Sequence, residues 1–174
     1  MRSIWRGTRV KLRAIEPDDW DTFDAWNGDD FTARRSSEIG FPQSKASVKQ
    51  WTEKIAASKP DNDGFRWMIE NLAGEAVGTI VTHSCDRRVG SFMYGLVIGA
   101  DHQRHGYARE AVQLVLRYYF EELNYQKVTV DVYDYNRASQ RFHESLGFTL
   151  EGRLRRTIYT DGKHHDEFIY GLLR

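Results

Sequence analysis

The sequence has little cysteine, no surplus of charge of either sign and no long hydrophobic run. Cys85 is its one cysteine, so no disulfide can form within the chain, and no apolar leader follows Met1. Both features are typical of a protein of the reducing cytoplasm. Lys and Arg number 25, as do Asp and Glu, so no overall basic field indicates a nucleic-acid partner. We therefore expect a cytoplasmic protein that does not bind nucleic acid.

The sequence also lacks the signs of a membrane protein, of several domains and of disorder. No window approaches the roughly 20 apolar residues that a membrane-spanning helix needs. Hydrophobic residues make up 40% and charged residues 29% of the 174 residues, which suits one globular domain. No repeat, low-complexity tract or linker divides the chain. Residues 1–174 are therefore predicted to form a single domain with no membrane partner.

Strand and helix patterns succeed one another in a definite order. An alternating segment, Thr8 to Ala14, predicts a strand, and Pro17 suits the first turn of a helix that ends near Trp26. The later elements are expected to be a helix over Ser44 to Ala57, antiparallel strands over Phe65 to Asn71, Ala76 to His83 and Gly90 to Ile98, a long helix over Ala108 to Leu123, a strand over Lys127 to Tyr133, a short helix over Arg137 to Ser145, and a hairpin turning at Asp161-Gly162. This order predicts a mixed α/β (α+β) fold.

The loop from Gln103 to Ala108 reads Gln-Arg-His-Gly-Tyr-Ala and lies between a predicted strand and a predicted helix. Gly106 permits backbone conformations that other residues resist, and small Ala108 lets a ligand approach closely. The free N–H groups and the positive end of the helix dipole favour an anion at this place. The loop therefore predicts a site for the phosphates of a nucleotide-like cofactor.

Two blocks downstream of the loop complete a known pattern: Asn136-Arg137-Ala138-Ser139 and Leu146-Gly147-Phe148. Together with Gln103, Gly106 and Ala108, which match the signature Gln/Arg-x-x-Gly-x-Gly/Ala, they resemble the GNAT acetyltransferase superfamily and its RimJ/RimL-like branch. The resemblance implies a GNAT-like fold, in which helices flank a central twisted mixed β-sheet and a C-terminal β-hairpin ends the chain. It also implies an N-acetyltransferase with acetyl-CoA as co-substrate, whose amine acceptor attacks the thioester directly in a ternary complex. A homodimer is a further expectation, because relatives are often dimers.

The resemblance assigns most of the expected cofactor contacts. The backbone of Leu96, Val97 and Ile98 is expected to pair with the pantetheine arm as a strand would. Asn136 is expected beside the cofactor and as the N-cap of the helix that follows it. The pyrophosphate is expected on the loop, at Gln103, Arg104, His105, Gly106, Tyr107, Ala108 and Arg109. The charged side chains of this loop either strengthen phosphate binding or are simply solvated on an exposed turn.

Two side chains are the expected catalytic residues. His143 occupies the position, three residues ahead of Leu146, at which the family usually has a tyrosine that assists the departing thiolate. A histidine, with a pKa near about 6.5, is able to donate a proton there, or it is an ordinary exposed helix residue. The resemblance places Ser139 near the thioester sulfur, where its hydroxyl can donate a hydrogen bond; otherwise Ser139 supports the helix start.

No general base stands where relatives often carry one. Met93 and Ile158 occupy positions at which relatives have glutamate. Asp131, Asp134 and Glu151 are able to accept a proton through water, or they are solvated residues at strand edges and loops. The general base is therefore not assigned from the sequence, and no metal site is expected to replace it.

The absence of an evident base bears on the acceptor amine. A lysine amine, with a pKa of about 10.4, costs roughly 4 kcal/mol to neutralise at about pH 7.5, whereas an α-amino group, at about 7.7 to 8.0, costs less than about 1 kcal/mol. A protein or peptide N-terminal α-amine is therefore the expected acceptor. Two alternatives stay open: an acetyltransferase of small amines such as polyamines or antibiotics, and a non-catalytic acetyl-CoA-binding sensor.

Overall fold

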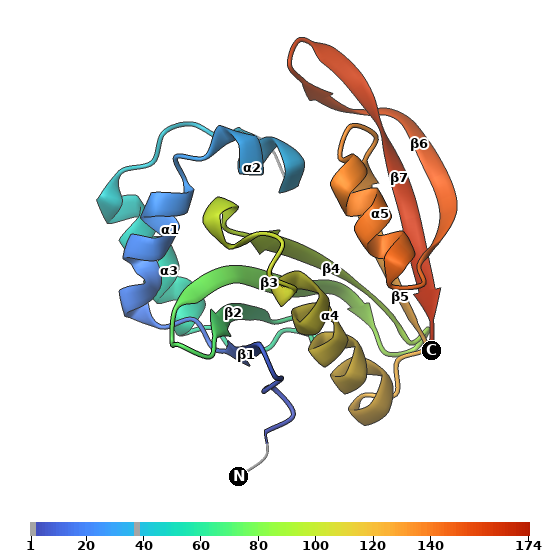
Figure 1. Cartoon of the computed structure of the whole chain (residues 1–174), viewed down its shortest axis with the longest axis horizontal. Helices are drawn as coiled ribbons and strands as arrows, with labels where there is room; N and C mark the ends of the chain where they lie inside the picture. Colours follow the sequence, from blue (N-terminus) through green and yellow to red (C-terminus); the bar gives the residue numbers. More distant parts are fainter. Residues whose placement is uncertain (1–2, 37–38) are drawn as a thin grey trace.

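A single twisted sheet runs through the computed structural model, which describes residues 3–36 and 39–174 (Figure 1). Within these ranges its seven strands lie in the order β1-β2-β3-β4-β5-β7-β6. Neighbouring strands are antiparallel except β4 and β5, which are parallel. The predicted mixed α/β class and the C-terminal hairpin are confirmed.

The strands lie close to where the sequence patterns predict them. They are β1 (Val10–Arg13), β2 (Arg66–Asn71), β3 (Ala76–Asp86), β4 (Ser91–Ile98), β5 (Lys127–Tyr133), β6 (Thr149–Thr160) and β7 (Lys163–Leu173). β1 is shorter than predicted, because the amides of Thr8 and Arg9 donate to a carboxylate on a helix. β3 is longer, since after a bulge beyond His83 it pairs with β4 again at Asp86.

Helices and helical turns cover the sheet. They are η1 (Pro17–Asp19), α1 (Trp20–Trp26), α2 (Asp30–Ser36), α3 (Lys45–Ala56), η2 (Ala100–His102), α4 (Tyr107–Arg117), η3 (Tyr118–Glu122) and α5 (Arg137–Ser145). The helix predicted from Pro17 begins as a 3-10 turn, and the one predicted to reach Leu123 ends in a π-helical turn, η3, closed by a bond from the Leu123 amide to the Tyr118 carbonyl. No helix among the described residues is long and apolar enough to span a membrane.

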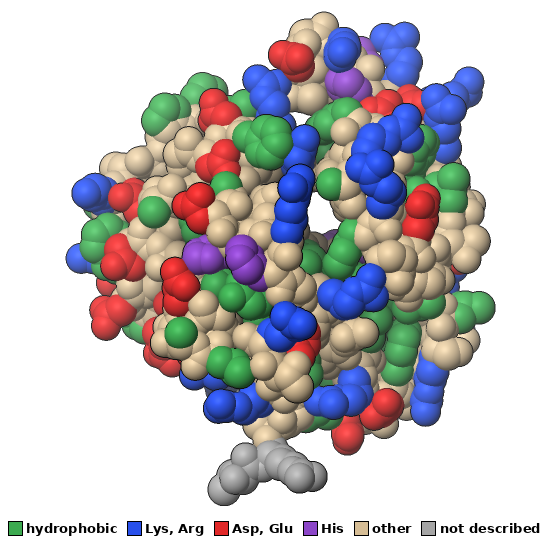
Figure 2. Space-filling view, in the orientation of Figure 1, with side chains coloured by type: hydrophobic (Ala, Val, Ile, Leu, Met, Phe, Trp, Pro, Cys, Tyr) green, Lys and Arg blue, Asp and Glu red, His purple; other side chains and the backbone are tan. Residues whose placement is uncertain are grey.

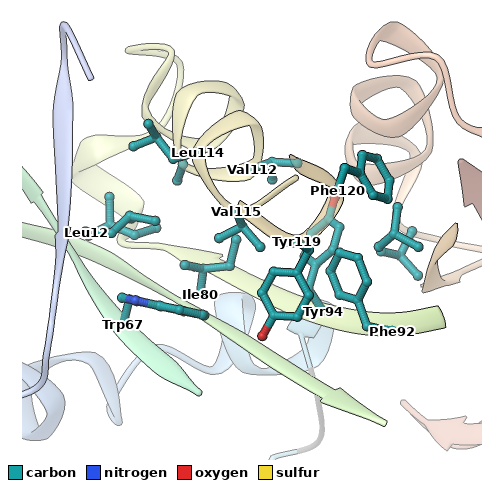
Figure 3. Close-up of a cluster of buried hydrophobic side chains, with 14 of the residues drawn as sticks. Leu12, Trp67, Ile80, Phe92, Tyr94, Val112, Leu114, Val115, Tyr119 and Phe120 are labelled. Atoms are coloured by element: carbon teal, nitrogen blue, oxygen red, sulfur yellow. The ribbon is translucent and has the colours of Figure 1, made fainter. Parts of the chain in front are cut away.

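The main core lies between α4 and the sheet (Figure 3). Val112, Val115 and Tyr119 follow one another on the buried face of the helical segment, as the 3.6-residue period requires. They pack onto the sheet at Ile80 and Phe92, and the rings of Phe92 and Tyr119 stack with centroids 4.2 Å apart. A second cluster, beneath α1 and α3, consists of Ile15, Phe23, Val48 and Met68. The sheet is thereby held rigidly at its β1–β4 end.

β4 and β5 stay paired over only part of their length. Their parallel register runs from Ser91 opposite Lys127 to Met93 opposite Thr129 and ends there. Beyond this point β4 continues to Ile98 beside β3, and β5 continues beside β7. The sheet is therefore split open between the carboxyl ends of two parallel strands, which is where α/β proteins place ligands.

Candidate functional site

A cavity of about 650 Å³ occupies the split between β4 and β5. Its walls come from the outer half of β4, the loop before α4, the carboxyl-terminal half of β5, the first turns of α5, and α2. Figure 2 shows an opening in this region with Lys and Arg side chains on its rim. The predicted site residues that line it are Leu96, Val97, Ile98, Gln103, Arg104, Gly106, Tyr107, Ala108, Arg109, Asn136, Ser139 and His143. The structure thus brings together all of the predicted residues except His105. His105 lines a neighbouring depression of about 530 Å³ on the outer side of the loop.

The loop before α4 has the backbone that an anion site needs. Gly106 is the N-cap of α4 with φ of 81°, in the left-handed region that side-chain-bearing residues avoid. Arg104 also has a positive φ, 66°, which is uncommon for a residue with a side chain and is typical of functional turns. The Arg109 guanidinium already has a partner, because it donates to the Ser145 hydroxyl at 2.6 Å. This hydrogen bond joins α4 to α5. The first turn of α4 therefore presents backbone N–H groups at the cavity.

Arg9 adds a positive charge to this loop that the sequence patterns did not indicate. Its Nη1 atom lies 3.4 Å from the carbonyl oxygen of His105, and its side chain lines the outer depression with Arg104 and Arg109. Arg9 reaches this position because the Glu110 carboxylate on α4 accepts the amide N–H groups of Thr8, Arg9 and Val10. These hydrogen bonds join residues about a hundred positions apart in the sequence, so no local sequence pattern indicates them.

The outer half of β4 has a free edge. Leu96, Val97 and Ile98 pair with β3 on one side, while β5 has already turned away on the other. Backbone N–H and C=O groups along such an edge are able to bind an extended ligand as an added strand. A pantetheine arm, with its two amide groups, has the chemistry that this edge accepts.

His143 lies buried on α5, so the expectation of an ordinary exposed histidine is wrong. Only 6% of its surface is exposed, and its Nδ1 atom lies 2.8 Å from the carbonyl oxygen of Ser139. A carbonyl oxygen only accepts hydrogen bonds, so Nδ1 carries the proton and Nε2 of the neutral ring is a bare acceptor. Burial lowers the pKa of His143, and the bond to the Ser139 backbone opposes that shift only in part. The ring is therefore neutral at pH 7, with an acceptor and not a donor at Nε2.

Asn136 and Ser139 hold the start of α5 in place. The Asn136 side-chain oxygen accepts the Ser139 amide N–H at 3.2 Å, which confirms the predicted N-cap. The other end of the same side chain donates to the backbone oxygen of Arg35 on α2, at 3.1 Å. Asn136 thus ties together two walls of the cavity.

Tyr94 is a further cavity residue that the sequence analysis missed. It lies on β4, on the same side of the sheet as Phe92, and is 5% exposed. Its ring centroid lies 5.9 Å from that of His143. The Tyr94 hydroxyl and the His143 Nε2 atom are buried, and neither has a hydrogen-bond partner within the part of the chain that the structure describes.

Asp131 and Glu167 are two acidic residues that line the cavity. Asp131 projects from β5 and Glu167 from β7, on the same face of the sheet because Asp131 pairs with Ile169, two residues from Glu167. Neither carboxylate forms a hydrogen bond or ion pair with any described residue. Burial raises the pKa of Asp131, which the charge of His83 lowers in part, and both burial and the charge of Asp131 raise the pKa of Glu167. The two side chains form an unneutralised negative pair at the cavity.

The other two acids that the sequence suggested as bases have structural partners. Asp134 accepts the Asp166 amide and lies 3.0 Å from Nδ1 of His165. Glu151 forms an ion pair with Lys127 at 2.6 Å. Neither lines the cavity. Of the three candidates, the structure leaves Asp131 in position and adds Glu167, whose distance along the chain hid it from sequence patterns.

Known proteins resemble this chain in sequence and in fold. The YokL protein of Bacillus subtilis (strain 168), named as an SPbeta prophage-derived uncharacterized N-acetyltransferase, is 38% identical over 99% of this chain and 94% of its own length. The spermidine N(1)-acetyltransferase of Vibrio cholerae is 24% identical over 91% of this chain and 90% of its own. A crystal structure of spermidine N-acetyltransferase from Vibrio cholerae with CoA and spermine has a TM-score of 0.82 at 21% identity, covering 96% of each chain, and this likeness shows the fold.

A family model confirms what the cavity indicates. The model described as "Acetyltransferase (GNAT) domain" matches residues 9–149, which include the loop, the free edge of β4 and the start of α5. These relationships set aside the non-catalytic alternative. The chain therefore belongs to the GNAT acetyltransferase family and is an acyltransferase that takes its acetyl group from acetyl-CoA.

Proposed function

We propose that this acetyltransferase acts on the N-terminal α-amine of a protein or peptide, by direct attack of the amine on the thioester in a ternary complex. The observation that carries the proposal is the negative pair of Asp131 on β5 and Glu167 on β7, which line the cavity from one face of the sheet, together with Arg35 in the same cavity. Two adjacent unpaired carboxylates suit one ammonium group. Arg35 on α2 lines the same cavity, and its positive charge opposes a second ammonium farther along the ligand.

The cofactor side of the proposal uses the loop and the β4 edge. The backbone of residues 103–109 and the side chains of Arg104, His105 and Arg9 receive the pyrophosphate. The backbone of Leu96 to Ile98 receives the pantetheine arm, and Asn136 lies beside it. With the pantetheine along β4, its sulfur end points into the cavity towards Ser139 and His143, where the acetyl group would lie.

Two residues accept protons in the proposed reaction, Asp131 on β5 and His143 on α5. Asp131, which is exposed to solvent, accepts a proton from the bound ammonium through water, and its raised pKa makes it a better base than an aspartate of ordinary pKa. The neutral nitrogen then attacks the acetyl carbon. The Ser139 hydroxyl donates to the sulfur, and the bare Nε2 of His143 accepts the proton that the nitrogen sheds as the amide forms. His143 thus acts as a proton acceptor, in contrast to the donor role expected from the sequence.

The acceptor preference follows from the strength of this base. A carboxylate acting through water does not supply the roughly 4 kcal/mol needed to neutralise a lysine amine at about pH 7.5, whereas an α-amine needs less than about 1 kcal/mol. The relative "Putative ribosomal N-acetyltransferase YdaF" of Bacillus subtilis (strain 168), 31% identical over 58% of this chain and 55% of its own length, supports an acceptor on a protein. A polyamine is the second candidate, supported by the spermidine acetyltransferase relative; the negative pair would bind one of its ammonium groups equally well, and Arg35 opposes the next one.

Thiol release with matched acceptors tests the proposal. We expect kcat/KM for an unblocked peptide to exceed that for its N-acetylated, lysine-containing counterpart and for spermidine by about 100-fold at pH 7.5. The ratio between the two peptides should narrow as the pH rises to about 9, because the neutral fraction of lysine grows tenfold per pH unit. Asp131→Asn should lower the rate, and Glu151→Gln, outside the cavity, serves as the matched control. Faster turnover of spermidine or of the blocked peptide throughout this range would refute the α-amine assignment.

A further inference from the structure

Arg35 brings a positive charge from α2 to a cavity whose sheet carries two carboxylates. Its side chain lines the cavity together with those of Asp131 and Glu167. The other arginines that line it, Arg104 and Arg109, belong to the loop before α4 and to the first turn of that helix. Among the described lining residues, Arg35 is therefore the arginine that the cofactor loop does not supply.

The backbone at Arg35 is held in place, whereas the polar atoms of its side chain are not engaged. Asn136 donates to the Arg35 carbonyl oxygen at 3.1 Å, and the Tyr135 hydroxyl donates to that of Arg34 at 2.6 Å, so these two carbonyls at the end of α2 have donors. The Arg35 guanidinium carbon lies 3.7 Å from the centroid of the Phe31 ring. It forms no ion pair or hydrogen bond with the part of the chain that the structure describes. The ring thus orients the guanidinium and leaves its N–H donors to a ligand.

Arg34, the preceding residue, shows the contrast. Its Nη1 atom lies 3.1 Å from the Thr160 hydroxyl and 3.7 Å from the Asp161 carboxylate, so it joins α2 to the hairpin. Arg35 has no such partner among the described residues, and the two carboxylates of the cavity form no ion pair with it. A cavity that keeps charges of both signs apart suits a ligand that carries both.

We propose that Arg35 binds a carboxylate that the acceptor carries close to its α-amine, so that the enzyme acts on N-termini with an acidic residue at the first or second position. The inference rests on the proposed function, which places the ammonium at Asp131 and Glu167. A planar guanidinium binds a carboxylate through two parallel hydrogen bonds. An extended chain advances about 3.4 Å per residue, so an acidic side chain on either residue lies within roughly 10 Å of the α-amine. Cavities of about 650 Å³ hold ligands of this size.

Arg35 distinguishes acceptors by attraction and by repulsion. A partly exposed ion pair contributes modestly, so a carboxylate should raise kcat/KM by about 5- to 10-fold over a neutral amide of the same shape. A lysine at the same place meets a like charge and should be disfavoured. Because Arg35 holds the acceptor equally in the ground state and in the transition state, the difference should lie in KM, with kcat unchanged.

Three tetrapeptide amides that differ only at their second residue test the proposal: Ala-Glu-Ala-Ala, Ala-Gln-Ala-Ala and Ala-Lys-Ala-Ala. In the parent, kcat/KM should fall in this order, and the preference for glutamate over glutamine should shrink in concentrated salt, because ions screen the pair. Arg35→Gln should abolish that preference, Arg35→Lys should keep part of it, and Arg35→Glu should invert the order. Equal kcat/KM for the glutamate and glutamine peptides in the parent, or a preference that survives in Arg35→Gln, would overturn the proposal.

Arg34→Gln is the matched control, since it removes a guanidinium from the same turn of α2 and should keep the preference for glutamate. Kd for acetyl-CoA in Arg35→Gln should stay within about twofold of the parent, because the proposed contact is made to the acceptor. A rise in this Kd as large as the lost preference would assign Arg35 to the phosphates of the cofactor and refute the proposal.

Calorimetry with the CoA complex separates this inference from the proposed reaction. The glutamate peptide should bind the parent about 5- to 10-fold more tightly than the glutamine peptide, and Arg35→Gln should bind both equally. If that preference is present without turnover, only the α-amine chemistry is refuted; if turnover is present without the preference, only the role of Arg35 is refuted. Free alanine is compared with alaninamide in the last arm. A preference for free alanine that depends on Arg35, with none between the peptides, would overturn the assignment to acidic N-termini in favour of a free amino acid.

Discussion

Replacing Glu110 by glutamine should both destabilise the fold and weaken the cofactor loop. Glu110 lies in the first turn of α4, and its two carboxylate oxygens accept four hydrogen bonds. One oxygen accepts the amide and the hydroxyl of Thr8, each at 2.8 Å, and the other accepts the amides of Arg9 at 2.6 Å and Val10 at 2.7 Å. A glutamine keeps one accepting oxygen and turns an NH₂ group towards the remaining two donors.

The loss of stability in Glu110→Gln depends on whether water can reach the donors that lose their acceptor. Each hydrogen bond to a charged group contributes roughly 1.5 to 3 kcal/mol, and two of the four are lost. Arg9 is exposed, so water replaces part of its loss, but Val10 is 0% exposed and its amide stays buried without an acceptor. We therefore expect the free energy of unfolding to fall by about 2 to 4 kcal/mol, and Tm by roughly 4 to 16 °C for a chain of this length.

The pKa of Glu110 in the folded state determines how the stability difference between parent and variant changes with pH. Burial by itself would raise the pKa of Glu110, but the hydrogen bonds from the Thr8 side chain and from the amides of Thr8, Arg9 and Val10 outweigh it and lower the pKa. A lowered pKa in the folded state means that this stabilisation is fully present above the unfolded value of about 4.3. It is lost as the pH falls through the folded value. The difference between parent and Glu110→Gln should therefore be complete at pH 7 and shrink in acid.

Urea unfolding at pH 7 and in acid measures this difference. Glu121→Gln, on the helical turn that continues α4, is the control, because its exposed carboxylate has no partner among the described residues. Gly7→Ala should reproduce the defect, since a Cβ at Gly7 would overlap the Glu110 carboxylate. Acetyl-CoA affinity should fall in both variants as Arg9 leaves the loop. Equal stability of Glu110→Gln and the parent at pH 7, or a difference that persists unchanged in acid, would refute the reasoning.

Two further predictions concern the cofactor loop and α5. Gly106→Asp should weaken acetyl-CoA binding in calorimetry while the protein stays folded, because it adds negative charge at the anion site. Gly74→Asp is the control, since Gly74 also has a positive φ but lies in open space away from the cavity. Unchanged affinity in folded Gly106→Asp would show that the loop does not bind the cofactor. Ser139→Ala, which removes the donor to the sulfur, and His143→Gln, which removes the acceptor of the nitrogen's proton, should each lower kcat by roughly 10² to 10⁴ with Kd for acetyl-CoA little changed. Full activity in both variants would remove these roles from both residues.

Sequence patterns predicted the elements and the features that depend on near neighbours. The order of the strands and of the predicted helices, the glycine turn at Gly106, the N-cap at Asn136 and the hairpin turn at Asp161-Gly162 agree with the structure, whereas helix α2 was not predicted. Hydrophobic period, capping and turn chemistry act within a few residues, so a linear sequence displays them directly. The family resemblance carried the choice of acetyl-CoA, and residues that match its signature do line the cavity.

The chemistry of the cavity was decided by contacts between distant segments. Asp131 and Glu167 lie on one face because β5 pairs with β7, and Arg9 reaches the loop because Glu110 binds the start of β1. The packing of β4 against α5 buries both Tyr94 and His143, and only this burial makes His143 neutral and leaves the Tyr94 hydroxyl without a partner. Strand register, burial and electrostatic coupling depend on which segments meet in space, and local patterns in the chain do not contain that information.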